Sequence, residues 1–344
     1  MPPLPLITAQ TEEKLLAFLT EHGHTKFRTQ QVLDWVWRKR VTTFDAMSNL
    51  PPALKNLLAE NFRFHTPEIV EIHGSADTTR KFLTRMEDGS LVESVIIPAA
   101  AAENGEKSER VTLCVSSQVG CAFGCKFCAS GLLGLKRHLT TGEIIGQILS
   151  AEAIAGKRVN NIVFMGMGEP LSNFDNVVDA LEIITSHRGL EIGARHITIS
   201  TSGFVPGLKK LAAYPRQIRL AVSLHGATDG VRDQIMPVNK NGRSPSSFRP
   251  LKNGAGEETR CPRWNTSSSG TSTTLRKTRP ISSGSPNACT PKSISSRTTP
   301  WRGFRGNALR KNAAVPSGMQ FTRRASPLPC GMKKVMTSTP PAGS

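Results

Sequence analysis

Three cysteines lie close together in the stretch Cys121-Ala-Phe-Gly-Cys125-Lys-Phe-Cys128. Thiolates are the usual ligands of iron–sulfur clusters, and the spacing C-x3-C-x2-C supplies three of them from one short loop. A 4Fe–4S cube that is held at three corners keeps its fourth iron open for chemistry. The stretch therefore predicts a cluster with Cys121, Cys125 and Cys128 as its protein ligands.

A zinc site and a disulfide are the alternatives for these cysteines. A zinc knuckle needs a fourth Cys or His at similar local spacing, and the next candidate, His138, lies ten residues beyond Cys128. A disulfide suits an oxidising compartment, whereas the N-terminus has no basic segment followed by an apolar one. No apolar run is long enough to cross a bilayer. A cytoplasmic protein without a membrane partner is expected.

The cysteine loop follows the first of several predicted strands that alternate with helices. Strands are expected at 111–115, 161–165, 196–200 and 218–224, and helices near 141–155, 173–185 and 207–213. Repeated strand–helix units form parallel sheets, so the fold class is α/β, with a partial (β/α) barrel. Ligands of such sheets bind at the carboxyl ends of the strands.

Short motifs follow the later strands of this predicted sheet. They are Gly166-Met-Gly168-Glu169-Pro170, Ser200-Thr-Ser202-Gly203 and Ser223-Leu224-His225. Each has an ordinary explanation when taken alone, because glycines make turns, Ser and Thr cap helices and most histidines are structural. Their position at successive strand ends, beside the cysteine loop, favours a shared ligand site.

A helical region and a β-hairpin precede the barrel. Apolar spacing predicts helices at 12–22, 29–38 and 53–62, and alternation predicts a hairpin over 79–98 that turns at Glu87-Asp88-Gly89. Basic and aromatic residues interleave in Lys26-Phe27-Arg28 and again in Trp35-Val36-Trp37-Arg38-Lys39-Arg40, a pattern more typical of a solvated helix face than of an RNA contact. The predicted domains are 1–70, a small helical domain; 71–109, a hairpin connector; 110–240, the barrel; and 241–344, a tail.

The motifs together resemble the RlmN family, radical S-adenosylmethionine (SAM) enzymes that methylate carbon 2 of adenine in 23S rRNA and in tRNA. The resemblance covers about residues 11–240 and is specific at the level of motifs. It rests on Leu91-Val-Glu93-Ser-Val, Cys114-Val-Ser-Ser-Gln-Val-Gly-Cys121, the cluster loop, Gly166-Met-Gly-Glu-Pro-Leu171, Ser200-Thr-Ser-Gly203, Ser223-Leu-His225 and Met236-Pro-Val-Asn239.

The resemblance implies a role for each of these stretches. The cluster would chelate the amino and carboxyl groups of S-adenosylmethionine, and the residues lining that cofactor would be Gly168, Glu169, Ser200, Ser223, Leu224 and His225. In the family, a cysteine near the C-terminus carries the methyl group that is transferred. Glu93 matches the family's proton acceptor, and Cys114 matches the second cysteine, which releases the product as a disulfide forms.

Partners are also implied by the resemblance. They are 23S rRNA and tRNA, which residues 1–70 would help to recognise, and an electron donor such as a flavodoxin. A monomer is expected. The target base must be unstacked to be reached, which fits single-stranded or loop RNA.

After Lys240 the sequence changes character. Residues 241–344 hold 18 Lys and Arg against 2 Asp and Glu, and 12 of the 23 prolines, whereas residues 1–240 hold 26 against 24. Most of the net charge of +18 therefore lies in the tail. A disordered basic tail has this composition.

A frameshift explains the tail better. When the tail is back-translated and read two nucleotides into each codon, permitted codons give an amphipathic helix after Lys240 and the family's C-terminal Ala-Ala-Cys-Gly-Gln. The pairs Trp264-Asn265 and Met332-Lys333 each force a Glu in that frame. The methyl-carrying cysteine would then lie across Pro341 and Ala342, out of frame. We expect a chain that at best assembles a cluster and does not methylate RNA.

Two rival functions remain open at this point. The first is methylation at carbon 8 of adenine, a related activity that uses the same kind of cluster and the same pair of cysteines. A non-catalytic RNA-binding protein with a genuine basic tail would bind RNA through residues 241–344, with steep salt dependence and no need for Cys121.

Overall fold

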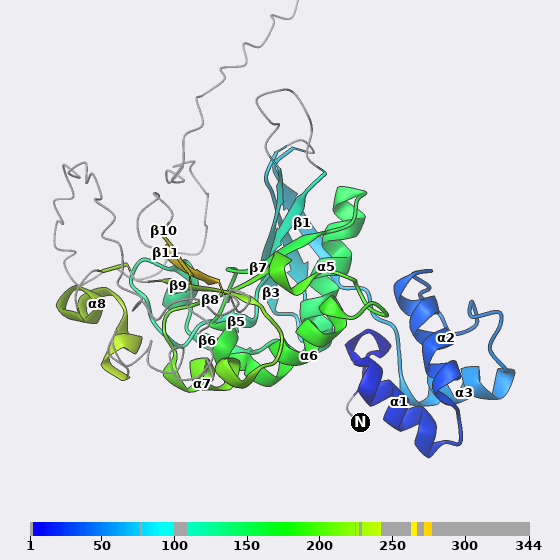
Figure 1. Ribbon diagram of the computed structural model, residues 1–344. Helices are drawn as coiled ribbons and strands as arrows, with labels where there is room; N and C mark the ends of the chain where they lie inside the picture. The colour runs from blue at the N-terminus through cyan, green and yellow to red at the C-terminus, as the bar shows by residue number, and fades with distance from the viewer. Residues whose placement is uncertain are drawn as a thin grey trace, which may run out of the picture. The chain divides into compact units, whose positions relative to one another are not determined.

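The computed structural model describes residues 3–75, 78–99, 109–223, 225–226 and 229–241, and the backbone of 263–266 and 272–276 (Figure 1). The predicted α/β class with a partial barrel is confirmed, since parallel strands alternate with helices through the centre of the chain. Most of the predicted tail, residues 241–344, lies outside the described residues.

Three helices open the chain after a short 3₁₀ turn, η1 (Ile7–Ala9). They are α1 (Glu12–Glu21), α2 (Lys26–Trp37) and α3 (Pro52–Asn61). Thr11 caps α1 by accepting a hydrogen bond from the Lys14 backbone N–H, and two acidic residues in the first turn suit the positive end of the helix. Buried leucines and valines of all three helices join the core. The predicted helices are confirmed, with ends that differ by up to three residues.

Within the described residues, a nine-stranded sheet forms the centre of the fold, with the strand order β1-β2-β3-β4-β7-β8-β9-β11-β10. The first strands are antiparallel: β1 (Glu68–His73), β2 (Arg80–Arg85), β3 (Leu91–Pro98) and β4 (Val111–Cys114). The predicted hairpin is β2 and β3, and Gly89 takes the φ of +78° that its turn requires. The predicted boundary at 70/71 falls inside β1.

Parallel strands follow in the second half of the sheet. They are β4, β7 (Asn161–Phe164), β8 (Ile197–Thr201) and β9 (Arg219–Ser223). The connecting helices are α5 (Thr141–Ala155), α6 (Phe174–Thr185) and α7 (Val205–Ala213), which lie along one side of the sheet (Figure 1). Crossovers of one hand place successive helices on the same face.

The first crossover helix shows how local sequence sets these boundaries. Thr140 and Glu143 form a capping box at the start of α5, and Gly156 ends it in the left-handed region with φ +63°. The buried side of the helix carries three isoleucines, Ile144, Ile145 and Ile148, together with the polar residue Gln147. Ends set in this way hold the preceding loop, which carries the cysteines, in a defined place.

Three further parts of the structure go beyond the sequence prediction. A small antiparallel pair, β5 (Gln118–Gly120) and β6 (Leu135–His138), brackets the cysteine loop and its single helical turn, α4 (Ala129–Leu132). After β9, α8 (Asp229–Ile235) leads into a 3₁₀ turn, η4 (Pro237–Asn241). Two short strands of the tail, β10 (Arg263–Thr266) and β11 (Ser272–Arg276), pair with each other, and β11 pairs with β9.

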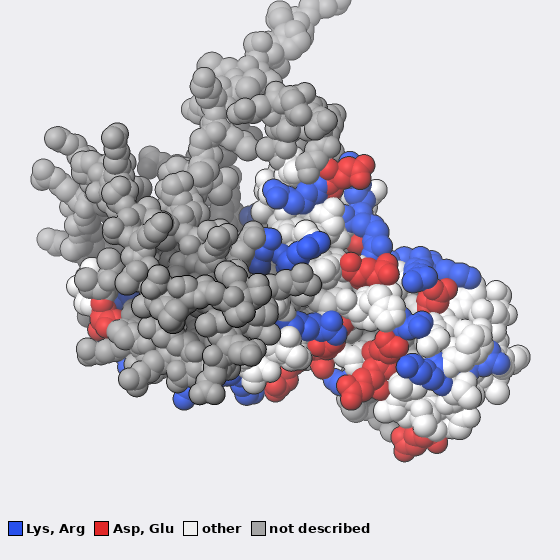
Figure 2. All heavy atoms as spheres, in the orientation of Figure 1, with Lys and Arg blue, Asp and Glu red and all other residues white. Residues whose placement is uncertain are grey.

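Charged side chains of both signs are mixed on the surface. Figure 2 shows Lys and Arg interspersed with Asp and Glu over the described part of one face. Several of them form ion pairs that join the N-terminal helices to the barrel, for example Arg40 with Glu152 at 2.7 Å. The described residues of this face therefore present no broad patch of one sign. No helix among the described residues is long and apolar enough to cross a membrane.

Candidate cofactor site at the strand ends

The carboxyl ends of the parallel strands meet at one edge of the sheet. Their register pairs Cys114 of β4 with Val163 of β7, and Ser200 of β8 with Ala221 of β9. The loops that follow these strands therefore start side by side. Most of the residues predicted for the site lie on them, as expected for a ligand site of a parallel sheet.

The cysteine loop is closed at its base by the β5–β6 pair. The Cys121 backbone N–H donates to the Gly134 carbonyl at 3.0 Å. Gly120, with φ +75°, comes so close to this carbonyl that a Cβ would lie 1.8 Å from the oxygen. Further along the loop, the Cys128 N–H donates to the Cys125 carbonyl at 3.0 Å. The loop is thus folded back on itself, which brings the thiols toward one another.

The three thiols of this loop suit an iron–sulfur cluster. Cys121, Cys125 and Cys128 interact electrostatically with one another, and all three are free. Within the described residues, no group of three or more His, Cys, Asp or Glu side chains is arranged to hold a single metal ion. Thiolates at the corners of a cube stand farther apart than the ligands of one ion, and sulfur is the donor that iron–sulfur clusters use. The donor set fits the cluster.

Burial raises the pKa values of two thiols in the cysteine loop. It raises the pKa of the Cys125 thiol to about 11, with further contributions from the neighbouring thiols and Glu169, and it raises the pKa of Cys121 as well. These thiols are therefore protonated at neutral pH when no metal is bound. Metal ligands must be thiolates, so assembly of a cluster releases protons.

Glu169 is the buried carboxylate of the site, with 4% of its surface exposed. Its Oε2 accepts hydrogen bonds from the backbone N–H and the hydroxyl of Ser202, both at 2.8 Å, and its Oε1 accepts from the Leu171 N–H at 3.2 Å. Burial nevertheless raises the pKa of Glu169. These three donors are all neutral, so an ammonium group of a ligand would be a favourable partner for the carboxylate.

Gly168 allows the loop after β7 to approach β5 closely. Its φ is +99°, and a Cβ at this position would lie 2.5 Å from the Cβ of Gln118. The Gln118 Oε1 accepts the Glu169 backbone N–H at 2.8 Å, while its Nε2 lies 2.9 Å from Nδ1 of His138. Gln118, which is fully buried, thus joins the Glu169 loop to the base of the cysteine loop.

His225 connects the end of β9 to the cysteine loop. Its ring centroid lies 4.0 Å from that of Phe127, which stands between two of the cysteines. The backbone of His225 has φ +48°, which is unusual for a residue with a side chain. Burial lowers the pKa of His225, so its ring is neutral at pH 7. Ser200 and Ser223 are half-buried at the ends of their strands, and Leu224 lies outside the described residues.

Cys114 and Glu93 lie near each other on neighbouring strands. Cys114 pairs with Val95, and Glu93 is two residues from Val95, so both side chains share one face of the sheet. Burial raises the pKa of Cys114 to about 11, a backbone hydrogen bond from Met165 opposes this shift, and the Glu93 charge adds to it. Lys81 Nζ lies 2.9 Å from Glu93 Oε2.

Two buried polar residues behind this pair were not assigned roles from the sequence. The Gln147 Oε1 accepts from the Ser94 hydroxyl at 2.8 Å and from the Ser116 N–H at 2.9 Å, and its Nε2 donates to the Ser116 carbonyl at 3.1 Å. The Ser116 hydroxyl donates to the Glu93 carbonyl at 2.6 Å and accepts from the Met167 N–H at 2.8 Å. Ser116 belongs to the quoted motif between Cys114 and Cys121, but Gln147 looks like any polar residue of a helix.

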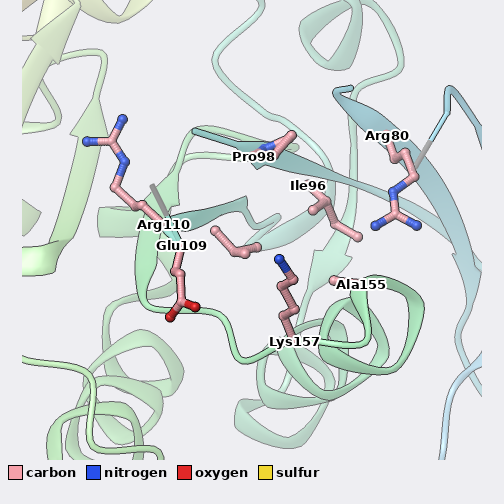
Figure 3. Close-up of a pocket in the computed structure, with 8 residues that line it drawn as sticks. Arg80, Ile96, Pro98, Glu109, Arg110, Ala155 and Lys157 are labelled. Atoms are coloured by element: carbon pink, nitrogen blue, oxygen red, sulfur yellow. The ribbon is translucent and has the colours of Figure 1, made fainter. Parts of the chain in front are cut away.

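A separate basic pocket lies away from this edge of the sheet. It is lined by Arg80, Ile96, Pro98, Glu109, Arg110, Val111, Ala155 and Lys157 (Figure 3). Val111 begins β4, whereas Cys114 ends it, so the pocket is at the amino end of the strand. Arg80 Nη1 donates to the Ile154 carbonyl at 2.9 Å, which caps the C-terminal turn of α5. This pocket is not part of the predicted site.

Comparison with known proteins identifies two matching families. Residues 7–63 match the ribosomal RNA large subunit methyltransferase N-terminal domain, and residues 115–244 match the radical SAM superfamily. Both matches fall almost wholly within residues 11–240, the part of the sequence that resembles the RlmN family. The match to the N-terminal domain spans the three N-terminal helices.

Curated relatives give the same result. The chain is 98% identical over 240 residues to the probable dual-specificity RNA methyltransferase RlmN of Akkermansia muciniphila, which covers 70% of this chain and 67% of that relative. It is 49% identical over 249 residues to the probable dual-specificity RNA methyltransferase RlmN 3 of Opitutus terrae, with the same coverage. These matches span about two thirds of the length of either relative.

A solved structure supports the fold. The chain is similar to a radical SAM methyltransferase from Sphaerobacter thermophilus, with 36% sequence identity, a TM-score of 0.64, and coverage of 74% of this chain and 73% of that chain. The sequence matches, the fold and the position of the cysteine loop at the strand ends all indicate the same family. The chain belongs to the RlmN family of radical SAM enzymes, the dual-specificity RNA methyltransferases.

Proposed function

We propose that residues 110–240 of this chain hold a 4Fe–4S cluster and S-adenosylmethionine, the cofactors that membership in the radical SAM superfamily implies. Cys121, Cys125 and Cys128 are the cluster ligands. When bound, the two cofactors supply the one-electron chemistry that generates a carbon radical. The observation that carries the proposal is the convergence of the cysteine loop, Glu169 and Cys114 at one edge of the sheet.

In this proposal, the residues of the protein bind the cofactor and orient it and the adenine base. Glu169 accepts a hydrogen bond from the ammonium group of S-adenosylmethionine, and this bond replaces the one that the Ser202 hydroxyl donates to the carboxylate. Gly168, Ser200, Ser223, Leu224 and His225 line the same cofactor. Glu93 accepts a proton from the adenine ring, and Cys114 releases the product. Residues 1–70 contribute to RNA recognition, with the 71–109 hairpin as connector, and a flavodoxin-like protein donates the electron to a monomeric enzyme.

We further propose that the 344-residue chain stops short of methyl transfer. The family reaction at carbon 2 of adenine, in 23S rRNA and tRNA, needs a methyl-carrying cysteine near the C-terminus. A frameshift after Lys240 removes this residue, and the 240-residue span of the 98% identity supports that position. The cysteines of the tail do not replace it.

Anaerobic reconstitution tests both parts of the proposal. The wild-type chain should bind four irons and four sulfides, whereas Cys125→Ala should not. With a reductant, the wild-type chain should cleave S-adenosylmethionine but form no methylated adenosine on tRNA or 23S rRNA. A chain with the frame restored after Lys240 should form 2-methyladenosine.

Mass spectrometry of the nucleosides separates the alternatives. Formation of 2-methyladenosine by the 344-residue chain would refute the frameshift part, and 8-methyladenosine from the restored chain would favour the carbon-8 activity. A wild-type chain that binds no cluster, yet binds RNA through residues 241–344 with steep salt dependence, would favour an RNA-binding protein instead.

A further inference from the structure

Arg232 is a buried cation next to the strand-end site. It lies on α8, and only 2% of its surface is exposed. Its Nη1 donates to the Ser223 carbonyl and its Nη2 donates to the Ser202 carbonyl, both at 3.1 Å. One guanidinium therefore joins the end of β9 to the residue that follows β8. Fixed fork geometry makes arginine suited to hold two carbonyls at a set separation.

The third arm of Arg232 reaches the 3₁₀ turn that follows α8. Its Nε donates to the Asn239 Oδ1 at 2.9 Å. Asn239, which is fully buried, donates from Nδ2 to Asp233 at 2.7 Å and to Asp229 at 3.1 Å. The buried positive charge is thus balanced by carboxylates on its outer side. A guanidinium stays protonated in proteins even when burial lowers its pKa, as it does here.

The same segment packs against the cysteine loop. The Lys126 N–H donates to the Ile235 carbonyl at 2.9 Å. Met236 and Val238 form a small buried cluster with the cluster ligand Cys125. Through its bond to Asn239, Arg232 therefore holds in place the segment whose residues Met236 and Val238 pack against Cys125. Its charge also favours the thiolate of Cys125, so the two groups lie within electrostatic range.

We propose that Arg232 is a positioning residue that holds the cysteine loop against the ends of β8 and β9 and raises the reduction potential of the cluster. The inference rests on the proposed function, in which Cys121, Cys125 and Cys128 hold a cluster. A cluster becomes more negative when it takes up an electron, and a nearby buried cation stabilises that state. Loss of the charge should make the cluster harder to reduce.

A redox titration of the reconstituted full-length chain, followed by electron paramagnetic resonance, tests the inference. Arg232→Gln keeps a planar polar side chain and removes the charge. Arg232→Lys keeps the charge and loses the fork. Arg216→Gln is the matched control, because it removes an arginine charge that is paired with Glu182 on the surface away from the loop.

The expected result is a selective effect of charge. At a fixed ambient potential, Arg232→Gln should lower the ratio of reduced to oxidised cluster by about tenfold, which corresponds to about 59 mV for one electron. Arg232→Lys and Arg216→Gln should stay within about twofold of the wild type. If Arg232→Gln does not load a cluster, the test uses Arg232→Lys instead. A ratio of reduced to oxidised cluster equal to that of the wild type in this variant supports the inference.

The opposing results are distinct. Equal ratios in the wild type and Arg232→Gln would overturn the inference and leave the proposed function standing. An Arg232→Lys ratio that falls by tenfold would also overturn it, because the charge is retained in that variant. A wild-type chain that binds neither iron nor sulfide would overturn the proposed function, and the inference with it.

Discussion

Lys81 Nζ lies 2.9 Å from Glu93 Oε2, across two neighbouring antiparallel strands and on the face of the sheet that also carries Cys114. The ion pair ties the Glu93 carboxylate to β2, whereas Cys114 lies on β4, on the other side of β3. Half of each charged side chain is exposed, so solvent weakens their attraction. The pair therefore matters more for the position and charge of Glu93 than for the stability of the fold.

Glu93→Gln should make Cys114 more reactive. Burial is the main reason for the raised pKa of Cys114, about 11, and the Glu93 carboxylate adds to it. Removal of that charge lowers the pKa, so the thiolate fraction and the rate of alkylation by iodoacetamide at pH 9 should rise about two- to threefold. Peptide mapping by mass spectrometry isolates Cys114 from the other cysteines.

Two variants sharpen this experiment. Lys81→Met leaves the Glu93 charge without its partner and should slow the alkylation of Cys114. Glu71→Gln, on the exposed strand β1, should change nothing. Acceleration by Lys81→Met, or no response to Glu93→Gln, would contradict an electrostatic link between Glu93 and the thiol.

Glu169→Gln should change the pH dependence of stability. The pKa of Glu169 is raised above its ordinary value of 4.5 by burial. A carboxyl group with a raised pKa stabilises the fold below 4.5 and loses that contribution as the pH rises through the folded pKa. The free energy of unfolding of the wild type relative to the variant should therefore fall between pH 4.5 and pH 7, as measured by urea denaturation. A constant difference would mean that Glu169 ionises as freely in the folded chain as in the unfolded one.

The same substitution should weaken cofactor binding. A neutral amide cannot offer a charged acceptor to an ammonium group. Equilibrium dialysis of the reconstituted chain should show at least about a tenfold loss of affinity for S-adenosylmethionine. Asp175→Asn, which alters an exposed carboxylate on α6, is the control. Unchanged affinity in Glu169→Gln would remove this residue from the cofactor site.

Gly120→Ala should open the base of the cysteine loop. The added Cβ would lie 1.8 Å from the Gly134 carbonyl oxygen, so β5 and β6 cannot keep their spacing. Iron content after reconstitution should fall to less than about half of the wild-type value. Gly134→Ala is a close control, because this glycine also has a positive φ of +67° but meets no atom within 4 Å. It should cost about 1 kcal/mol of stability and retain the cluster. Equal iron loss in both variants would point to backbone strain instead.

Gln147→Leu should destabilise the fold more than an ordinary polar substitution. The change leaves the Ser94 hydroxyl and the N–H and carbonyl of Ser116 without their buried partner. Unsatisfied buried groups of this kind cost about 2–3 kcal/mol in the free energy of unfolding. Gln217→Leu, at an exposed position before β9, should stay within about 0.5 kcal/mol. A small effect of Gln147→Leu would show that water replaces the lost partner.

Local spacing was enough to predict much of this protein. Cys121, Cys125 and Cys128 are adjacent in the chain, so their use as one ligand set needs no knowledge of the fold. Alternating strands and helices require a parallel sheet, and that in turn places Glu169 and Ser200 near one another at its carboxyl edge. Family membership and the cofactor pair are confirmed by the comparisons, while the roles of the individual site residues stay predictions.

The tertiary structure alone decided which buried side chains support the site. Gln147 and Arg232 make hydrogen bonds to residues on other elements, and nothing in their own local sequence marks them. Gln118 belongs to the motif between Cys114 and Cys121, but the motif does not show that its side chain bonds to the Glu169 backbone. The β5–β6 pair was missed because two strands of three and four residues around a glycine-rich loop carry too little alternation to be recognised. Such contacts depend on how the loops pack after the sheet has formed. Sequence periodicity therefore determines the strands, and long-range packing determines what holds the cysteine loop to them.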